Sequence, residues 1–71
     1  MLPATLDGRR FLRAMARFGW HVARTKGSHR VLKDGTGRVL IVAFHDDLSR
    51  NSVRRALREA SIPEDAFERD W

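Results

Sequence analysis

The chain has 71 residues, a formal net charge of +5 and no cysteine. So short a chain builds one domain around one core, because it buries only about 60% of the surface that its unfolded form exposes. The lack of cysteine excludes a disulfide framework and a Cys-based zinc site, and it favours a reducing compartment such as the cytosol. Neither a membrane-length apolar run nor a secretory signal pattern is present. We expect residues 1–71 to form a single soluble, cytoplasmic domain.

The positive charge is concentrated before residue 59. Residues 1–58 hold 13 basic and 4 acidic side chains (+9), whereas residues 59–71 hold 1 and 5 (−4). Twelve of the basic residues are arginine and two are lysine, and the forked guanidinium suits phosphate oxygens. Nucleic acid is therefore the leading partner class, although such a composition also fits a merely well-solvated surface.

The pattern from Asp7 to Phe18 predicts an amphipathic helix, with apolar residues at helical spacing and an arginine stripe on another face. Asp7 is a good N-cap for it, and Gly19 is a good left-handed C-terminal residue. Three strands are predicted next, over residues 20–23, 30–33 and 38–44, with a hairpin turn over residues 34–37.

A second helix is predicted after Ser49, with an apolar seam formed by Val53, Ala56, Leu57 and Ala60. Ser61-Ile62-Pro63-Glu64 has the form of a capping box, which predicts a short helix toward Trp71. The expected fold is α+β, a three-stranded antiparallel sheet with helices on one face and the other face open to solvent or a partner.

Three histidines, His21, His29 and His45, are candidates for acid–base chemistry, because imidazole exchanges protons near neutral pH. His21 is expected to face solvent without a functional role, because strand alternation places it opposite its neighbours Trp20 and Val22.

His29 has the most unusual surroundings, a Gly-Ser pair before it and several cations near it. Glycine allows close approach of the backbone to a ligand, and nearby cations hold phosphates. Cleavage of RNA through its own 2′-hydroxyl needs a base, an acid and cations. A polar histidine on an open sheet face is the plain alternative. The candidate RNA-binding residues around His29 are Arg24, Lys26, Gly27, Ser28 and Arg30.

His45 ends the last predicted strand, where antiparallel pairing can bring it near His29 and create a two-histidine site. A structural hydrogen bond to Asp46 or Asp47 is the competing interpretation. No metal site is predicted, because a lone His-Asp-Asp run lacks a second ligand cluster. Nothing indicates a cofactor.

Several short motifs in order resemble the HicA toxins of bacterial toxin–antitoxin systems, from about residue 7 to about residue 62. They are Phe18-Gly19-Trp20, Lys26-Gly27-Ser28-His29, Val39-Leu40-Ile41-Val42, His45, Leu48, and Val53 through Ala60. The chain differs from the usual family pattern at Ala43, Asn51-Ser52 and Ala60-Ser61, where proline, Gly-Thr and Ala-Gly are frequent.

The resemblance implies a double-stranded RNA-binding-domain-like fold and an mRNA interferase that cuts RNA without a metal, with His29 as the catalytic residue. It also implies a HicB antitoxin that binds the toxin and masks that histidine. Two alternatives remain open from the residues. One is a non-catalytic RNA-binding module of the same fold, and the other is a DNA-binding protein that uses the arginines of the second helix, Arg50, Arg54, Arg55 and Arg58.

Overall fold

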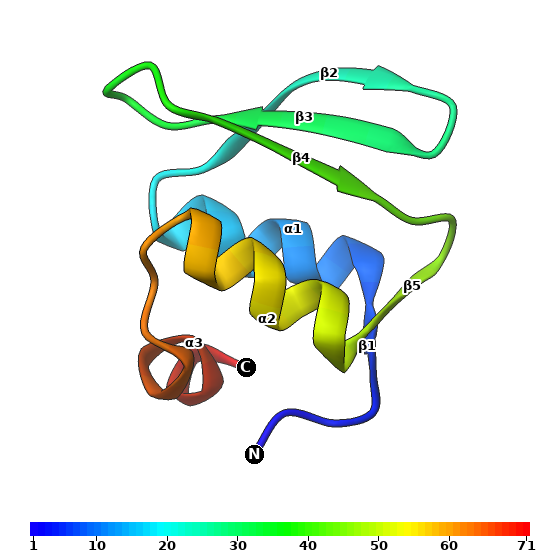
Figure 1. Cartoon of the computed structure of the whole chain (residues 1–71), viewed down its shortest axis with the longest axis vertical. Helices are drawn as coiled ribbons and strands as arrows, with labels where there is room; N and C mark the ends of the chain where they lie inside the picture. Colours follow the sequence, from blue (N-terminus) through cyan, green and yellow to red (C-terminus); the bar gives the residue numbers. More distant parts are fainter.

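Two helices lie side by side beneath a three-stranded antiparallel sheet in the computed structural model, which describes residues 1–71 (Figure 1). The elements in chain order are β1 (Thr5–Asp7), α1 (Gly8–Arg17), β2 (His21–Lys26), β3 (His29–Lys33), β4 (Val39–Ala43), β5 (Asp47–Ser49), α2 (Arg50–Glu59) and α3 (Glu64–Asp70). No helix has the length and apolar character needed to cross a membrane.

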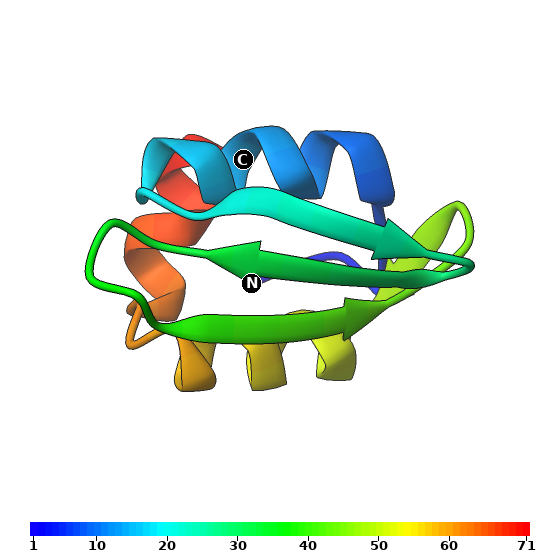
Figure 2. The same cartoon turned by 90° about the horizontal axis from the view of Figure 1, so that it is seen from above.

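The predicted fold class is confirmed. The sheet has the order β2-β3-β4, and α1 and α2 both cover the same face of it, with the other face bare (Figure 2). The arrangement fits a double-stranded RNA-binding-domain-like fold. Burial alternates along β4, where Leu40 and Val42 are buried and the residues between and beside them are exposed, as expected for a sheet covered on one face.

A second, two-stranded sheet was not predicted from the sequence. Strands β1 and β5 pair antiparallel, with Leu6 opposite Leu48, and both leucines are buried. The Gly8 N–H donates to the Asp46 carbonyl at 2.8 Å. A Cβ at Gly8 would lie 2.3 Å from the Phe44 ring, so glycine is needed for this close approach. Three-residue strands are too short to show a periodic pattern.

The predicted helix caps are confirmed for α1 and α2. The Asp7 side chain accepts from the Arg10 N–H, and the Ser49 side chain accepts from the Ser52 N–H. Gly19 has φ +87° at the end of α1. The Trp20 N–H donates to the Met15 carbonyl there, which is the Schellman closure of a helix.

The predicted capping box at residues 61–64 is wrong. Ser61 adopts φ +58°, and the Ile62 N–H donates to the Leu57 carbonyl, so this segment closes α2 with a second Schellman motif. The N-cap of α3 is Pro63, which has no side-chain hydrogen bond. Ser61 therefore belongs to the end of one helix and not to the start of the next.

The core is a single cluster of 17 buried hydrophobic residues, to which both sheets and all three helices contribute. Trp20 is only 3% exposed. It lies outside the first strand of the sheet, which begins at His21 and not at the predicted residue 20. Strand β2 runs to Lys26, beyond the predicted end at Ala23, and all of its residues are exposed. The basic residues after Ala23 therefore stand on a strand and not in a loop.

Candidate functional site

The uncovered face of the sheet, here called the outer face, carries most of the predicted site residues. Directly paired residues in antiparallel strands share a face, and the register pairs Lys26 with His29 and His29 with Ala43. The other directly paired residues of the three strands are assigned to one face or the other in the same way. The outer face consists of His21, Arg24, Lys26, His29, Val31, Lys33, Val39, Ile41 and Ala43.

The outer face is cationic. Arg24, Lys26 and Lys33 lie on it and no carboxylate does. Arg24 and Lys26 share this face by strand alternation, and a register shift between Val22 and Arg24 marks a bulge at Ala23 that brings His21 onto the same face. The structure thus brings together three of the residues predicted from the sequence, Arg24, Lys26 and His29.

A two-residue hairpin turn places His29 opposite Lys26. Gly27 is the first central residue of the turn and has φ +59°, whereas Ser28 has no positive φ. Glycine is preferred at this position of a type II′ turn. No atom lies within 4 Å of a Cβ built at Gly27, so backbone conformation alone explains this glycine.

Arg30 points the other way from its neighbour His29. Its side chain donates to the Ser28 carbonyl at 2.9 Å and also to the Phe44 carbonyl. Its guanidinium carbon lies 4.1 Å from the centre of the Phe44 ring. Alternation along β3 puts Arg30 on the helix-facing side of the sheet. The structure therefore engages Arg30 with the protein and separates it from the cations of the outer face.

His45 and His29 line different hollows. His45 is exposed in a hollow of about 450 Å³ near the start of α1, which Arg9, Arg30 and Phe44 also line. Neither of the neighbouring aspartates forms an ion pair with His45. The structure therefore does not combine the two histidines in one hollow.

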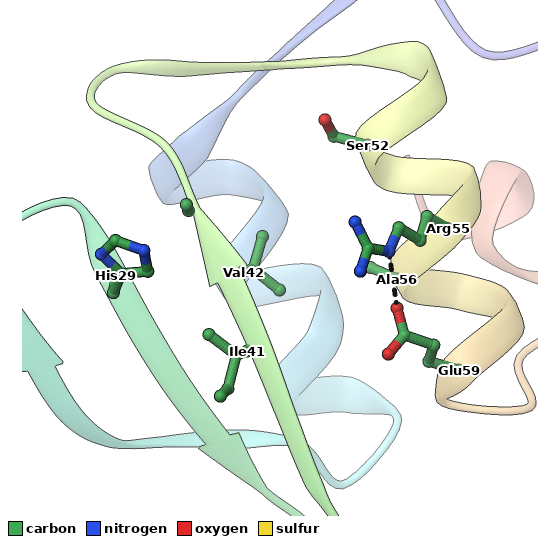
Figure 3. Close-up of a pocket in the computed structure, with 8 residues that line it drawn as sticks. His29, Ile41, Val42, Ser52, Arg55, Ala56 and Glu59 are labelled. Atoms are coloured by element: carbon green, nitrogen blue, oxygen red, sulfur yellow. Dashed lines mark hydrogen bonds and ion pairs between the residues drawn. The ribbon is translucent and has the colours of Figure 1, made fainter.

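His29 instead lies at the rim of a groove between β4 and α2, of about 320 Å³ (Figure 3). The groove is lined by residues of β3, β4 and α2, which are His29, Ile41, Val42, Ala43, Ser52, Arg55, Ala56 and Glu59. Sequence reasoning did not identify this groove, because no local pattern shows which helix face lies beside which strand edge.

Three of the four arginines of α2 contact other groups of the protein. Arg54 pairs with Glu64 at 3.0 Å, Arg55 pairs with Glu59 at 3.1 Å, and Arg50 donates to the Pro3 carbonyl at 3.2 Å. These contacts give no support to the DNA-binding alternative. No three histidine or carboxylate side chains gather in a group that could hold a metal ion.

A family model describes this combination of α1, three strands and α2. The model for the HicA toxin of bacterial toxin–antitoxin systems matches residues 8–62. The chain belongs to the HicA toxin family. The match begins at α1 and ends at the Schellman closure of α2, so it includes the outer face and the groove of this HicA-family protein and excludes α3. No curated protein sequence matches the chain.

Proposed function

We propose that this HicA-family toxin is a metal-independent endoribonuclease in which His29 transfers the proton. The observation that carries the proposal is the position of His29 on an exposed, cationic sheet face without carboxylates, directly opposite Lys26. Cations attract RNA phosphates, and paired side chains on adjacent strands have Cβ atoms about 5 Å apart. A phosphate held by Arg24 and Lys26 beside the Gly27-Ser28 turn is then within reach of the imidazole.

The reaction uses the RNA's own hydroxyl. The imidazole of His29 takes the proton of the 2′-hydroxyl, and the 2′ oxygen forms a bond to the adjacent phosphorus. The bond from phosphorus to the 5′ oxygen breaks, and His29 returns the proton to that oxygen. The products are a 2′,3′-cyclic phosphate and a 5′-hydroxyl end. The Lys26 ammonium stabilises the negative charge that develops on the phosphate oxygens.

A HicB-type antitoxin covers the outer face in this proposal. Ile41 is 62% exposed and Val39 is 55% exposed on the same face as His29. Exposed apolar side chains beside charged ones are typical of a surface that a protein partner buries. Binding there both satisfies the apolar side chains and keeps RNA away from His29.

The test compares His29→Ala with His21→Ala, because both remove one exposed imidazole from the same sheet face. We expect His29→Ala to lose at least about 100-fold in the rate of RNA cleavage in EDTA, while His21→Ala cleaves like the parent protein. Circular dichroism checks that both variants are folded.

Cleavage by His29→Ala at the parental rate would refute the role of His29. RNA that is bound by the parent at saturation but stays whole on a gel would instead favour the non-catalytic RNA-binding module. A third variant, His45→Ala, is expected to retain cleavage because His45 lines a different hollow.

A further inference from the structure

We infer that the groove between β4 and α2 binds one base of the RNA, next to the phosphate at His29. The inference rests on the proposed function and adds a site that reads the nucleotide. His29 is both a residue of the cationic outer face and a lining residue of the groove. A nucleotide whose phosphate lies at His29 therefore has the groove within reach of its base.

Only the methyl group of Ala43 occupies the outer-face position between His29 and the edge of β4. Ala43 pairs directly with His29 and is exposed, and it lines the groove as well. In Figure 3, His29 lies on one side of β4 and the α2 residues lie on the other. A small residue at this position leaves the path from the imidazole to the groove open.

The charge of the groove suits a base better than a phosphate. Its charged lining residues other than His29 are Arg55 and Glu59, which pair with each other and sum to zero. The outer face, by contrast, carries Arg24, Lys26 and Lys33 without a carboxylate. Phosphates are attracted to that cationic face, whereas a neutral base is not repelled by the carboxylate of Glu59.

The edge of β4 supplies hydrogen-bonding groups toward the groove. The Phe44 N–H donates to the Ser28 carbonyl at 2.9 Å. In an antiparallel pair every second residue bonds to the partner strand, so the N–H and C=O groups of the even-numbered residues of β4 point toward β3. Ile41 and Ala43 are odd-numbered, so their backbone groups point away from β3, and β4 has no second neighbouring strand on that side. Their N–H and C=O groups therefore point to the free edge, where each donor and acceptor pair can bind the polar edge of a base.

The α2 wall supplies a planar cation and an apolar floor. The floor is formed by the apolar side chains of Val42 and Ala56, which are both buried. Arg55 is 77% exposed, and its partner Glu59 holds the guanidinium along the groove wall (Figure 3). A guanidinium plane stacks well on a base, and an ion pair this exposed is weak enough to adjust when a base enters.

The size of the groove favours a base over a peptide segment. Its volume of about 320 Å³ is at the lower end of sites for small organic groups, which is roughly 300 Å³. A bound strand would need the whole length of the β4 edge and room for alternate side chains. A single ring system needs neither.

The test is a binding experiment with RNA hexamers that lack the base at one position in turn. All proteins carry His29→Ala, so that the RNA stays whole during the measurement. Arg55→Ala removes the proposed stacking group, and Arg58→Ala is the matched control. Arg58 is an exposed arginine of the same helix that does not line the groove, so the two variants lose the same charge.

We expect one abasic position to weaken binding about tenfold in the background protein and in Arg58→Ala. In Arg55→Ala the same abasic position is expected to cost less than twofold, because the base has already lost its stacking partner. Equal binding of all abasic hexamers would overturn the inference. That result is expected if the groove binds a partner protein and no base.

An equal abasic penalty in both arginine variants would overturn it as well. The proposed function has a separate outcome, since RNA cleavage by the protein without the His29 substitution is measured independently. Cleavage without a sensitive abasic position contradicts the base site alone, whereas no RNA binding by any variant contradicts both.

Discussion

Ser61 is the only residue other than glycine with a positive φ. A left-handed conformation costs an L-residue roughly 1–2 kcal/mol, and glycine is the usual residue at this point of a Schellman motif. The Ser61 hydroxyl accepts a hydrogen bond from the Arg38 side chain at 3.2 Å, which stabilises this conformation. That bond is exposed, so it offsets only part of the conformational cost.

We predict that Ser61→Gly raises the free energy of unfolding by about 0.5–1 kcal/mol. Urea denaturation followed by circular dichroism measures the change. Ser61→Ala is the control, because it removes the hydroxyl but keeps the strained φ, and it should be no more stable than the parent. A Ser61→Gly protein less stable than the parent would show that the hydrogen bond from Arg38 outweighs the strain.

One carboxylate accepts three hydrogen bonds within the turn between β3 and β4. Asp34 accepts hydrogen bonds from the Thr36 N–H, the Thr36 hydroxyl and the Arg38 N–H at 2.8–2.9 Å. Desolvation acts to raise the pKa of Asp34, but these bonds and the charge of Arg38 outweigh it and hold the pKa below its usual value of 3.8. A carboxyl with a lowered pKa in the folded state stabilises the fold above the unfolded pKa, and this contribution disappears as the pH falls through the folded pKa.

We therefore predict that Asp34→Asn is less stable than the parent at pH 6 and that the difference shrinks as the pH falls below 3.8. Thermal unfolding over the range from pH 6 to pH 2 measures the difference. Asp70→Asn is the control, because Asp70 is exposed at the end of α3. A difference that grows toward low pH would contradict the role given to the Asp34 carboxylate.

The cations of the sheet and of α2 differ in whether they contact other groups of the protein. Arg24, Lys26 and Lys33 stand on the open sheet face, whereas Arg30 is held between the Ser28 and Phe44 carbonyls. The arginines of α2 are mostly paired with carboxylates or carbonyls. Among the cations of the sheet, only Arg24, Lys26 and Lys33 have no protein partner and are free to release counterions when RNA binds.

We predict that Arg24→Gln lowers the slope of log K against log salt for RNA binding by about 0.7, the value for one phosphate contact to a single strand. Arg30→Gln should keep the parental slope but lower the free energy of unfolding by about 1–3 kcal/mol, because two carbonyls lose a charged donor. Fluorescence anisotropy at several salt concentrations measures the slope. Equal slopes for Arg24→Gln and the parent would exclude Arg24 from the RNA contacts.

Much of the fold was predictable because its signals are local. Asp7, Gly19 and Ser49 mark helix ends within a few residues of where they act, and the apolar seam of α2 repeats every helical turn. The alternation in β4 and the turn residues after Lys33 are equally local. Ser61 shows the limit of such signals, because the same four residues fit either the end of one helix or the start of another.

The sequence by itself determined the fold class, the helices, the three main strands and the motif residues that place the chain in its family. Only the tertiary structure decided that β1 pairs with β5, that Arg30 turns away from His29, that His45 lies in a separate hollow, and that a groove joins His29 to α2. Caps, turns and periodicity depend on residues a few positions apart. Pairing, facing and grooves instead join residues far apart in the chain, and packing of the whole core selects them.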